Sequence, residues 1–128
     1  MQASQTEELD FMSKTHAIME AAVGLKADQI VGLDMRQVSS FADSFVIASG
    51  GSNRHVRSIA EAIIKALEES GEHPIGVEGL EEGRWVLIDA NDVIVHIFAS
   101  DFRDDFSLER LWSDAPLIAF EAEATPES

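Results

Sequence analysis

The sequence predicts a single α/β domain in which helices flank a mixed sheet of about five strands. Three observations lead to this prediction. The chain has 128 residues, which suits one hydrophobic core. Segments with the 3.6-residue period of helices alternate with short runs of β-branched and other apolar residues. No internal repeat and no long linker divides the chain, so one domain accounts for it.

The first predicted element is an amphipathic helix from Thr6 to Leu25 that ends near Gly24. Apolar residues recur along this segment with a helical period and form two neighbouring rows. The rows are Leu9, Met12, Met19 and Val23, and beside them Phe11, Ile18, Ala22 and Leu25.

A second helix is predicted after the glycine pair at 50–51, and it is the clearest helix in the chain. Ser52 and Asn53 are both suitable N-cap residues, and Gly71 supplies the stop. One apolar face lies between these signals, formed by Val56, Ile59, Ala60, Ile63 and Leu67.

Short β-like runs make up the sheet. The last two runs are joined by a tight turn at Ala90-Asn91, where asparagine tolerates a positive φ. The passage from Phe45 through Val77 is expected to be a right-handed crossover between parallel strands. The predicted strands are 30–35, 44–48, 75–77, 84–89 and 92–98.

The last pair of predicted strands is apolar on both faces. Such a pair either lies in a sheet covered on both sides or presents one face to a partner. Tryptophan is enriched at the energetic centres of interfaces, although core packing explains Trp85 equally well. One face carries Trp85, Leu87, Ile94 and His96, and the other carries Val86, Ile88, Val93 and Val95.

The charge balance favours a basic protein as partner. The chain has 24 acidic and 9 basic residues, a formal net charge of −15, which disfavours binding to nucleic acid phosphates. An acidic field would instead steer a basic surface towards it, although high charge also serves solubility alone. The chain has no cysteine, and neither a secretory signal nor a membrane span fits. The cytoplasm is the expected compartment.

The residue patterns for catalysis are weak. The turn at Gly50-Gly51, with Arg54 and Arg57 nearby, lies where phosphate-binding loops occur, but it lacks their motif endings and a plain turn with a helix cap is favoured. A metal site from Asp104, Asp105 and a histidine is conceivable, but a solvated acidic run explains these residues better. No catalytic, cofactor-binding or metal-binding residue is therefore predicted. The histidines, which show no metal-binding spacing, are His16, His55, His73 and His96.

Six motifs in order resemble the ribosomal silencing factor or Iojap-like proteins. The resemblance runs from about Ala27 to Pro116. The sequence departs from the usual pattern at Ser44, where an aromatic residue is common, and at Phe106, where tyrosine is common. The motifs occupy residues 43–47, 50–56, 77–79, 83–89, 92–98 and 108–116.

The resemblance implies a repressor of translation rather than an enzyme. Such proteins are expected to bind the large ribosomal subunit through basic ribosomal protein fourteen and to block joining of the small subunit when nutrients are scarce. The resemblance also implies a topology similar to nucleotidyltransferases without their activity, no cofactor and a possible homodimer. A nucleotide-binding or nucleotidyltransferase-like enzyme is the alternative.

A partner-binding face follows from the resemblance and the strand pattern together. We expect Trp85, Leu87 and His96 at its apolar centre, although a hydrogen-bonded, buried role is favoured for His96 taken alone. The expected division of the chain is an N-terminal helix at 1–26, the α/β domain at 27–116 with a short helix before 114, and a disordered acidic tail at 117–128. The charged rim is expected to comprise Glu82, Asp101 and Asp104.

Overall fold

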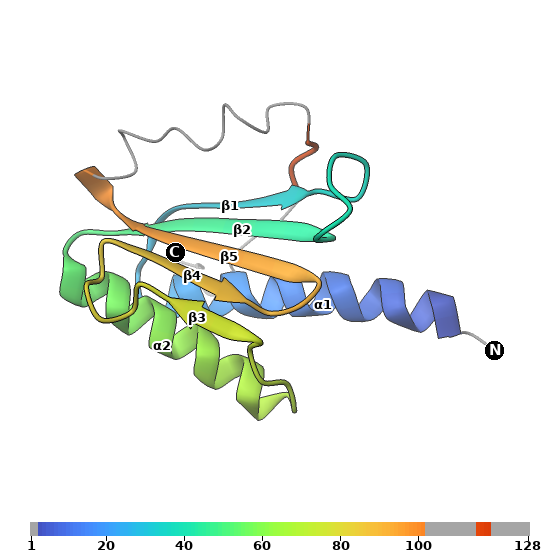
Figure 1. Cartoon of the computed structure of the whole chain (residues 1–128), viewed down its shortest axis with the longest axis horizontal. Helices are drawn as coiled ribbons and strands as arrows, with labels where there is room; N and C mark the ends of the chain where they lie inside the picture. The colour runs from blue at the N-terminus through green and yellow to red at the C-terminus, as the bar shows by residue number, and fades with distance from the viewer. Residues whose placement is uncertain (1–2, 102–114, 119–128) are drawn as a thin grey trace, which may run out of the picture.

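Two helices pack on one face of a five-stranded sheet in the computed structural model, which describes residues 3–101 and 115–118 (Figure 1). The predicted α/β class and the predicted number of strands are confirmed, and most element boundaries move by one to three residues. In chain order the elements are α1 (Ala3–Gly24), β1 (Asp28–Asp34), β2 (Ser44–Gly50), α2 (Asn53–Glu69), β3 (Gly76–Glu78), β4 (Trp85–Asp89) and β5 (Val93–Ala99).

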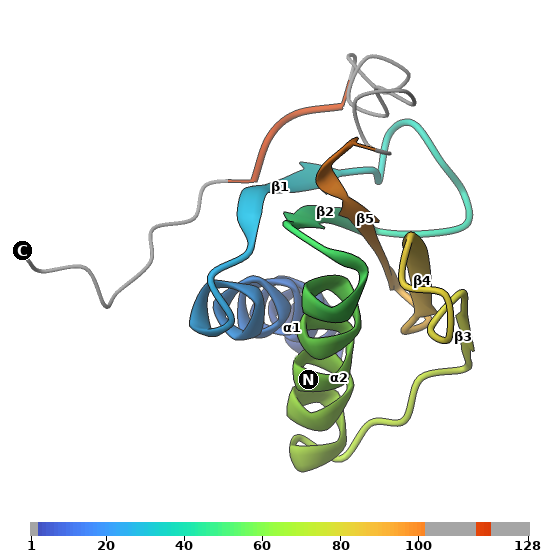
Figure 2. The ribbon, with the colours of Figure 1, turned by 90° about the vertical axis from the view of Figure 1, so that its left-hand side faces the viewer.

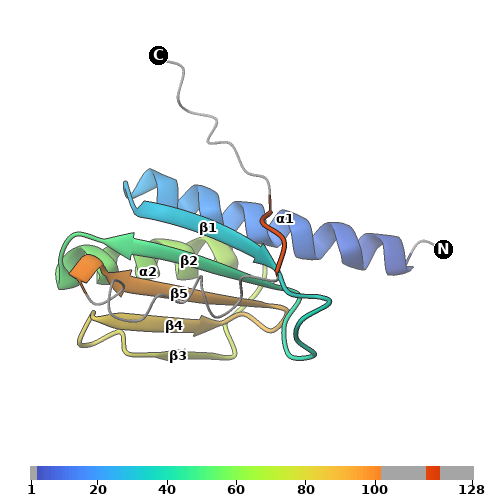
Figure 3. The ribbon, with the colours of Figure 1, turned by 90° about the horizontal axis from the view of Figure 1, so that it is seen from above.

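The strands lie side by side in the order β1-β2-β5-β4-β3 (Figure 3). Strands β2 and β5 are parallel, while the other neighbouring strands are antiparallel, so the sheet is mixed as predicted. These pairings also make β3 parallel to β2, which confirms that the passage through α2 connects parallel strands. Both β5 and β4 lie between those two strands, because the hairpin after β3 inserts into the middle of the sheet.

Both helices cover the same side of the sheet, and the main core lies between them and the strands (Figure 2). The second of the two predicted rows on α1 is buried at Phe11, Ile18 and Ala22, and the whole predicted face of α2 is buried. The sheet contributes to this core the four residues of β4 and β5 that were predicted to share one face: Val86, Ile88, Val93 and Val95.

The ends of α2 and the β4–β5 turn form as the local sequence indicates. The Ser52 hydroxyl accepts a hydrogen bond from the amide of His55 at 3.1 Å, which makes Ser52 the N-cap. Gly71 has φ 92° just past the C-terminus of α2, and Asn91 has φ 78° in the turn, as these positions require.

Polar contacts fix α1 against the rest of the domain. The buried Thr15 hydroxyl lies 2.8 Å from the Ser44 hydroxyl, so the Ser44 side chain faces α1. The Lys14 ammonium contacts Glu72 at 2.6 Å and Asp92 at 2.5 Å. Burial opposes the charge of Lys14, but its hydrogen bonds to both carboxylates outweigh that effect and raise its pKa. The ammonium therefore links α1 to the segment after α2 and to the β4–β5 turn.

The segment 115–118 runs along the free side of β1. The Asp34 amide donates to the carbonyl of Pro116, and the Ile118 amide donates to the carbonyl of Gly32, both at 2.8 Å. The predicted short helix and most of the predicted tail lie outside the described residues. Within the described residues, no helix combines the length and hydropathy needed to cross a membrane.

Candidate partner-binding face

The side of the sheet turned away from α1 and α2, here called the outer face, is apolar and aromatic. The register of the strands brings the predicted residues together, since Leu87 is paired with His96 and Trp85 with Phe98. Strand β2 extends the face beyond the predicted residues. The apolar and aromatic outer-face residues of these three strands are Phe45 and Ile47 on β2, Trp85 and Leu87 on β4, and Ile94, His96 and Phe98 on β5. The polar residues Ser49 on β2 and Asp89 on β4 lie on the same face.

Trp85 is half-buried on this face and is held from two directions. Its ring stacks on that of Phe98, with the ring centroids 5.2 Å apart and an interplanar angle of 27°. Its indole Nε1–H donates a hydrogen bond to Nδ1 of His96 at 3.2 Å. The indole is therefore fixed by the outer face and is not sealed in the core between the sheet and the helices.

His96 lies within the aromatic cluster and is only 6% exposed. Its ring packs 5.2 Å from the ring of Phe45 and 6.1 Å from that of Phe98, measured between centroids. Burial disfavours the charged form and lowers the pKa of His96 to about 4. The imidazole is neutral at pH 7, which agrees with its role as hydrogen-bond acceptor for Trp85.

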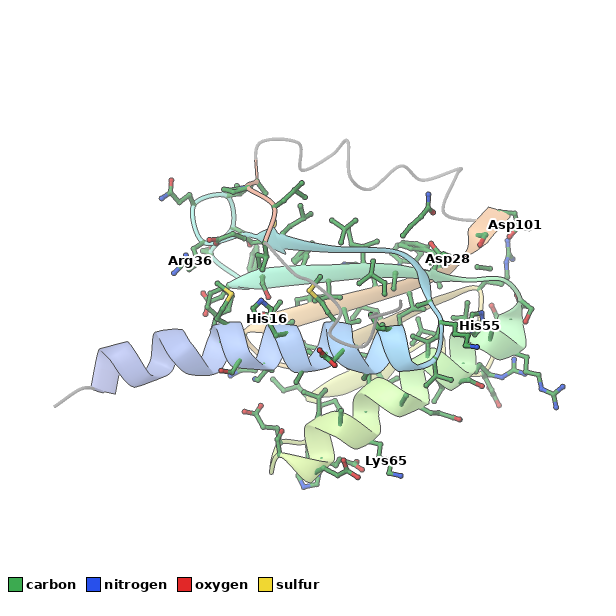
Figure 4. All side chains as sticks on the ribbon, turned by 180° about the vertical axis from the view of Figure 1, so that it is seen from behind. His16, Asp28, Arg36, His55, Lys65 and Asp101 are labelled. Carbon is green, nitrogen blue, oxygen red and sulfur yellow. The ribbon has the colours of Figure 1, made fainter. Side chains whose placement is uncertain are left out.

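Acidic side chains stand beside the outer face. Glu82 is exposed in the turn before β4, and Asp101 is exposed just after β5, at the same end of the sheet as His55 (Figure 4). Asp104 lies outside the described residues. Exposed Glu78, an acid close to Trp85 in sequence, is paired with Leu87 and so belongs to the same face, a placement that depends on the β3–β4 register.

The turn that precedes Trp85 is built on two glycines with positive φ. A side chain at Gly79 would lie 2.2 Å from the carbonyl oxygen of Trp85, and one at Gly83 would lie 2.5 Å from that of Asn53. An Arg57 guanidinium nitrogen donates to the carbonyl of Glu81 at 3.3 Å. The turn thus packs closely on the start of α2.

The glycine-rich turn before α2 is occupied by contacts within the chain. The Gly51 amide donates to Nδ1 of His55 at 2.9 Å. The other ring nitrogen of His55 therefore carries the proton and donates to the carbonyl of Leu25 at 2.6 Å. His55 links this turn to the end of α1, and the geometry favours a turn with a helix cap over a phosphate site.

A groove of about 340 Å³ lies between α1 and α2, on the opposite side from the outer face. Lys14 lines this groove together with Glu72, and Asp92 also contacts the ammonium. Because two carboxylates already neutralise that charge, the groove has no attraction for a nucleotide phosphate.

The sequence analysis did not identify the exposed apolar residues of the loop between β1 and β2. Phe41 is 88% exposed and Val38 is also exposed in this loop. A lone exposed aromatic residue gives no periodic signal in a sequence. Phe41 and Val38 are not members of the outer-face cluster, so Phe41 provides a useful control for experiments on that face.

The fold and the outer face define an acidic α/β domain whose sheet carries a tryptophan-containing aromatic face. A family model described as "Ribosomal silencing factor during starvation" matches residues 8–128. The chain belongs to this family, RsfS, which confirms the predicted resemblance. The family consists of ribosome-binding regulators and not of enzymes, so the alternative of a nucleotide-using enzyme is set aside.

Two curated relatives and one solved structure illustrate the similarity. The chain is 45% identical to ribosomal silencing factor RsfS of Halalkalibacterium halodurans over 96 residues, 75% of this chain and 82% of the relative. It is also 45% identical to RsfS of Bacillus subtilis, over 72% of this chain and 78% of the relative. A crystal structure of a Chromobacterium violaceum protein is 33% identical, with a TM-score of 0.79 over 91% of this chain and 96% of that one.

Proposed function

We propose that this silencing factor binds the large ribosomal subunit through ribosomal protein fourteen and thereby blocks joining of the small subunit. The outer face is proposed as the contact surface. The observation that best supports this is Trp85, a half-buried indole held in one orientation beside exposed acidic residues. Such a surface suits a basic protein partner with an apolar centre.

The acidic surroundings supply the second argument. Glu78 and Glu82 flank the start of β4, and Asp101 follows the end of β5. Opposite charges across an interface raise the association rate and select the register of the complex. The net charge of −15 acts in the same direction at longer range.

Replacing Trp85 tests the proposed surface. We expect Trp85→Ala to weaken binding to large subunits by about 2 kcal/mol or more, roughly 30-fold in Kd, because an aromatic anchor is lost. The variant should fail to inhibit subunit joining, measured by light scattering after small and large subunits are mixed. Circular dichroism checks that the variant is folded.

Phe41→Ala is the matched control, because it removes an exposed aromatic side chain that is not part of the outer-face cluster. It should inhibit joining like the unaltered protein. Full inhibition by folded Trp85→Ala would contradict the proposed surface, and loss of inhibition only in Phe41→Ala would place the contact on the β1–β2 loop.

Three further expectations remain proposals at this point. They are a topology like that of nucleotidyltransferases, a cytoplasmic location and a homodimer. The homodimer is tested by analytical ultracentrifugation of the purified chain, with a dimer mass expected at micromolar concentration. The proposed division of the chain at 26 and 116 is tested by limited proteolysis.

A further inference from the structure

We propose that His96 is a positioning residue for Trp85, and that the partner therefore meets the indole through its ring and not through its N–H. This inference rests on the proposed function, since it describes how the outer face is prepared for that partner. It replaces the expectation that His96 itself contacts the partner.

The geometry of the pair carries the first step. Trp85 and His96 come from adjacent antiparallel strands, and the register pairs His96 with Leu87, two residues along from Trp85. That diagonal relation is within reach of large aromatic side chains on the same face. The observed separation of 3.2 Å between indole Nε1 and imidazole Nδ1 is that of a hydrogen bond.

Packing fixes the imidazole in turn. The ring is sandwiched in the cluster near Phe45 and Phe98, and its plane is within 4° of that of Phe98. The described side chains that pack closest to it from β2 and β4 carry no charge: Phe45, Ile47, Trp85 and Leu87. The imidazole thus acts as a rigid, neutral acceptor on the scaffold of β5.

The chemistry of the partner follows from this contact. An indole has a single hydrogen-bond donor, and here that donor is used inside the domain. A partner group that approaches Trp85 therefore gains nothing by offering an acceptor. An aliphatic side chain, or the guanidinium or ammonium group of a basic protein, fits the ring itself through apolar and cation–π contact.

Three substitutions at these positions separate the roles. His96→Phe keeps a ring in the cluster but removes the acceptor, whereas His96→Asn places an amide oxygen near the position of Nδ1. Trp85→Phe keeps an aromatic ring and removes the N–H. Val95→Ala, a buried change on the helix side of the same strand, controls for general destabilisation.

The first readout is nuclear magnetic resonance of the indole N–H groups of the full-length chain. The signal of Trp85 is assigned by its absence in Trp85→Phe. We expect its proton to exchange with solvent at least about tenfold faster in His96→Phe, because the hydrogen bond is gone, and close to the normal rate in His96→Asn.

The second readout is the affinity for purified large ribosomal subunits. His96→Phe should bind at least about fivefold more weakly, while His96→Asn and Val95→Ala should bind within about threefold of the unaltered chain. Trp85→Phe should retain most of the affinity that Trp85→Ala loses. Equal loss in the two Trp85 variants would overturn the ring contact.

Unchanged indole exchange or unchanged affinity in folded His96→Phe would overturn the positioning role. If His96→Phe does not fold, restoration of both readouts by His96→Asn supports the role, and failure of His96→Asn to retain indole protection overturns it. An unaltered chain that does not bind large subunits would overturn the proposed function, and the indole exchange then decides the positioning role separately.

Discussion

At the scale of single residues, the buried His96 side chain holds the orientation in which Trp85 lies on the outer face. His96 is a buried polar side chain of the cluster, and desolvation lowers its pKa to about 4. The neutral imidazole can then accept the indole hydrogen bond of Trp85. A charged imidazole would lose that acceptor, so the arrangement depends on His96 staying uncharged.

Acid should therefore destabilise the fold through His96. The unfolded chain binds the proton near pH 6.5, whereas the folded chain binds it only near pH 4, so stability is lost as pH falls through this interval. We expect a loss of about 2–3 kcal/mol between pH 7 and pH 4.5, measured by urea denaturation. Carboxylates add their own pH dependence, so the relevant quantity is the difference from His96→Phe, which should lack this loss. Identical profiles would contradict the buried, neutral imidazole.

At the scale of elements, α1 is held to the domain by packing and by Lys14. The ammonium lies in reach of two carboxylates and of the carbonyl of Ala90, 3.1 Å away. These groups come from segments far apart in the sequence, so the contact stabilises tertiary structure and not α1 alone.

Removing that charge should loosen α1. We expect Lys14→Met to lower the free energy of unfolding by about 1–2 kcal/mol, because Glu72 and Asp92 lose a shared cation but stay partly in contact with water. Lys65→Met on the exposed side of α2 is the control, and its effect should be under about 0.5 kcal/mol. The midpoints of urea unfolding provide the measurement, and equal midpoints for the two variants would exclude the structural role of Lys14.

Local signals explain which elements the sequence could predict. Helix α2 has its cap at Ser52, a regular apolar face and its stop at Gly71, all close together in sequence, and each is found as predicted. Successive side chains of a strand point to opposite faces of the sheet, and this two-residue period likewise predicted which residues of β4 and β5 share a face.

Non-local pairing explains what the sequence could not predict. The order of the strands, the position of Glu78 beside Leu87 and the pairing of Pro116 with β1 depend on contacts between distant segments. The bond between Trp85 and His96 depends in addition on register and on the protonation of one ring nitrogen. The sequence could therefore indicate which residues share the outer face. It could not indicate which of them would contact a partner and which would position a neighbouring side chain.

At the scale of the whole molecule, acidic groups on both sides contribute to the field that the proposed basic partner would meet. Glu82 lies beside the outer face, while exposed Glu61 lies on α2, which covers the opposite side of the sheet. Reversing either charge changes the net charge equally. Because exposed charges are screened beyond about 8 Å at physiological ionic strength, only the nearer one should alter docking strongly.

Co-sedimentation with purified large ribosomal subunits at physiological ionic strength tests the central claim most directly. We expect the unaltered chain and Glu61→Lys to pellet with large subunits and not with small ones. Glu82→Lys should bind roughly three- to tenfold more weakly. Failure of the unaltered chain to pellet, or equal weakening by both charge reversals, would contradict binding of the large subunit through the outer face.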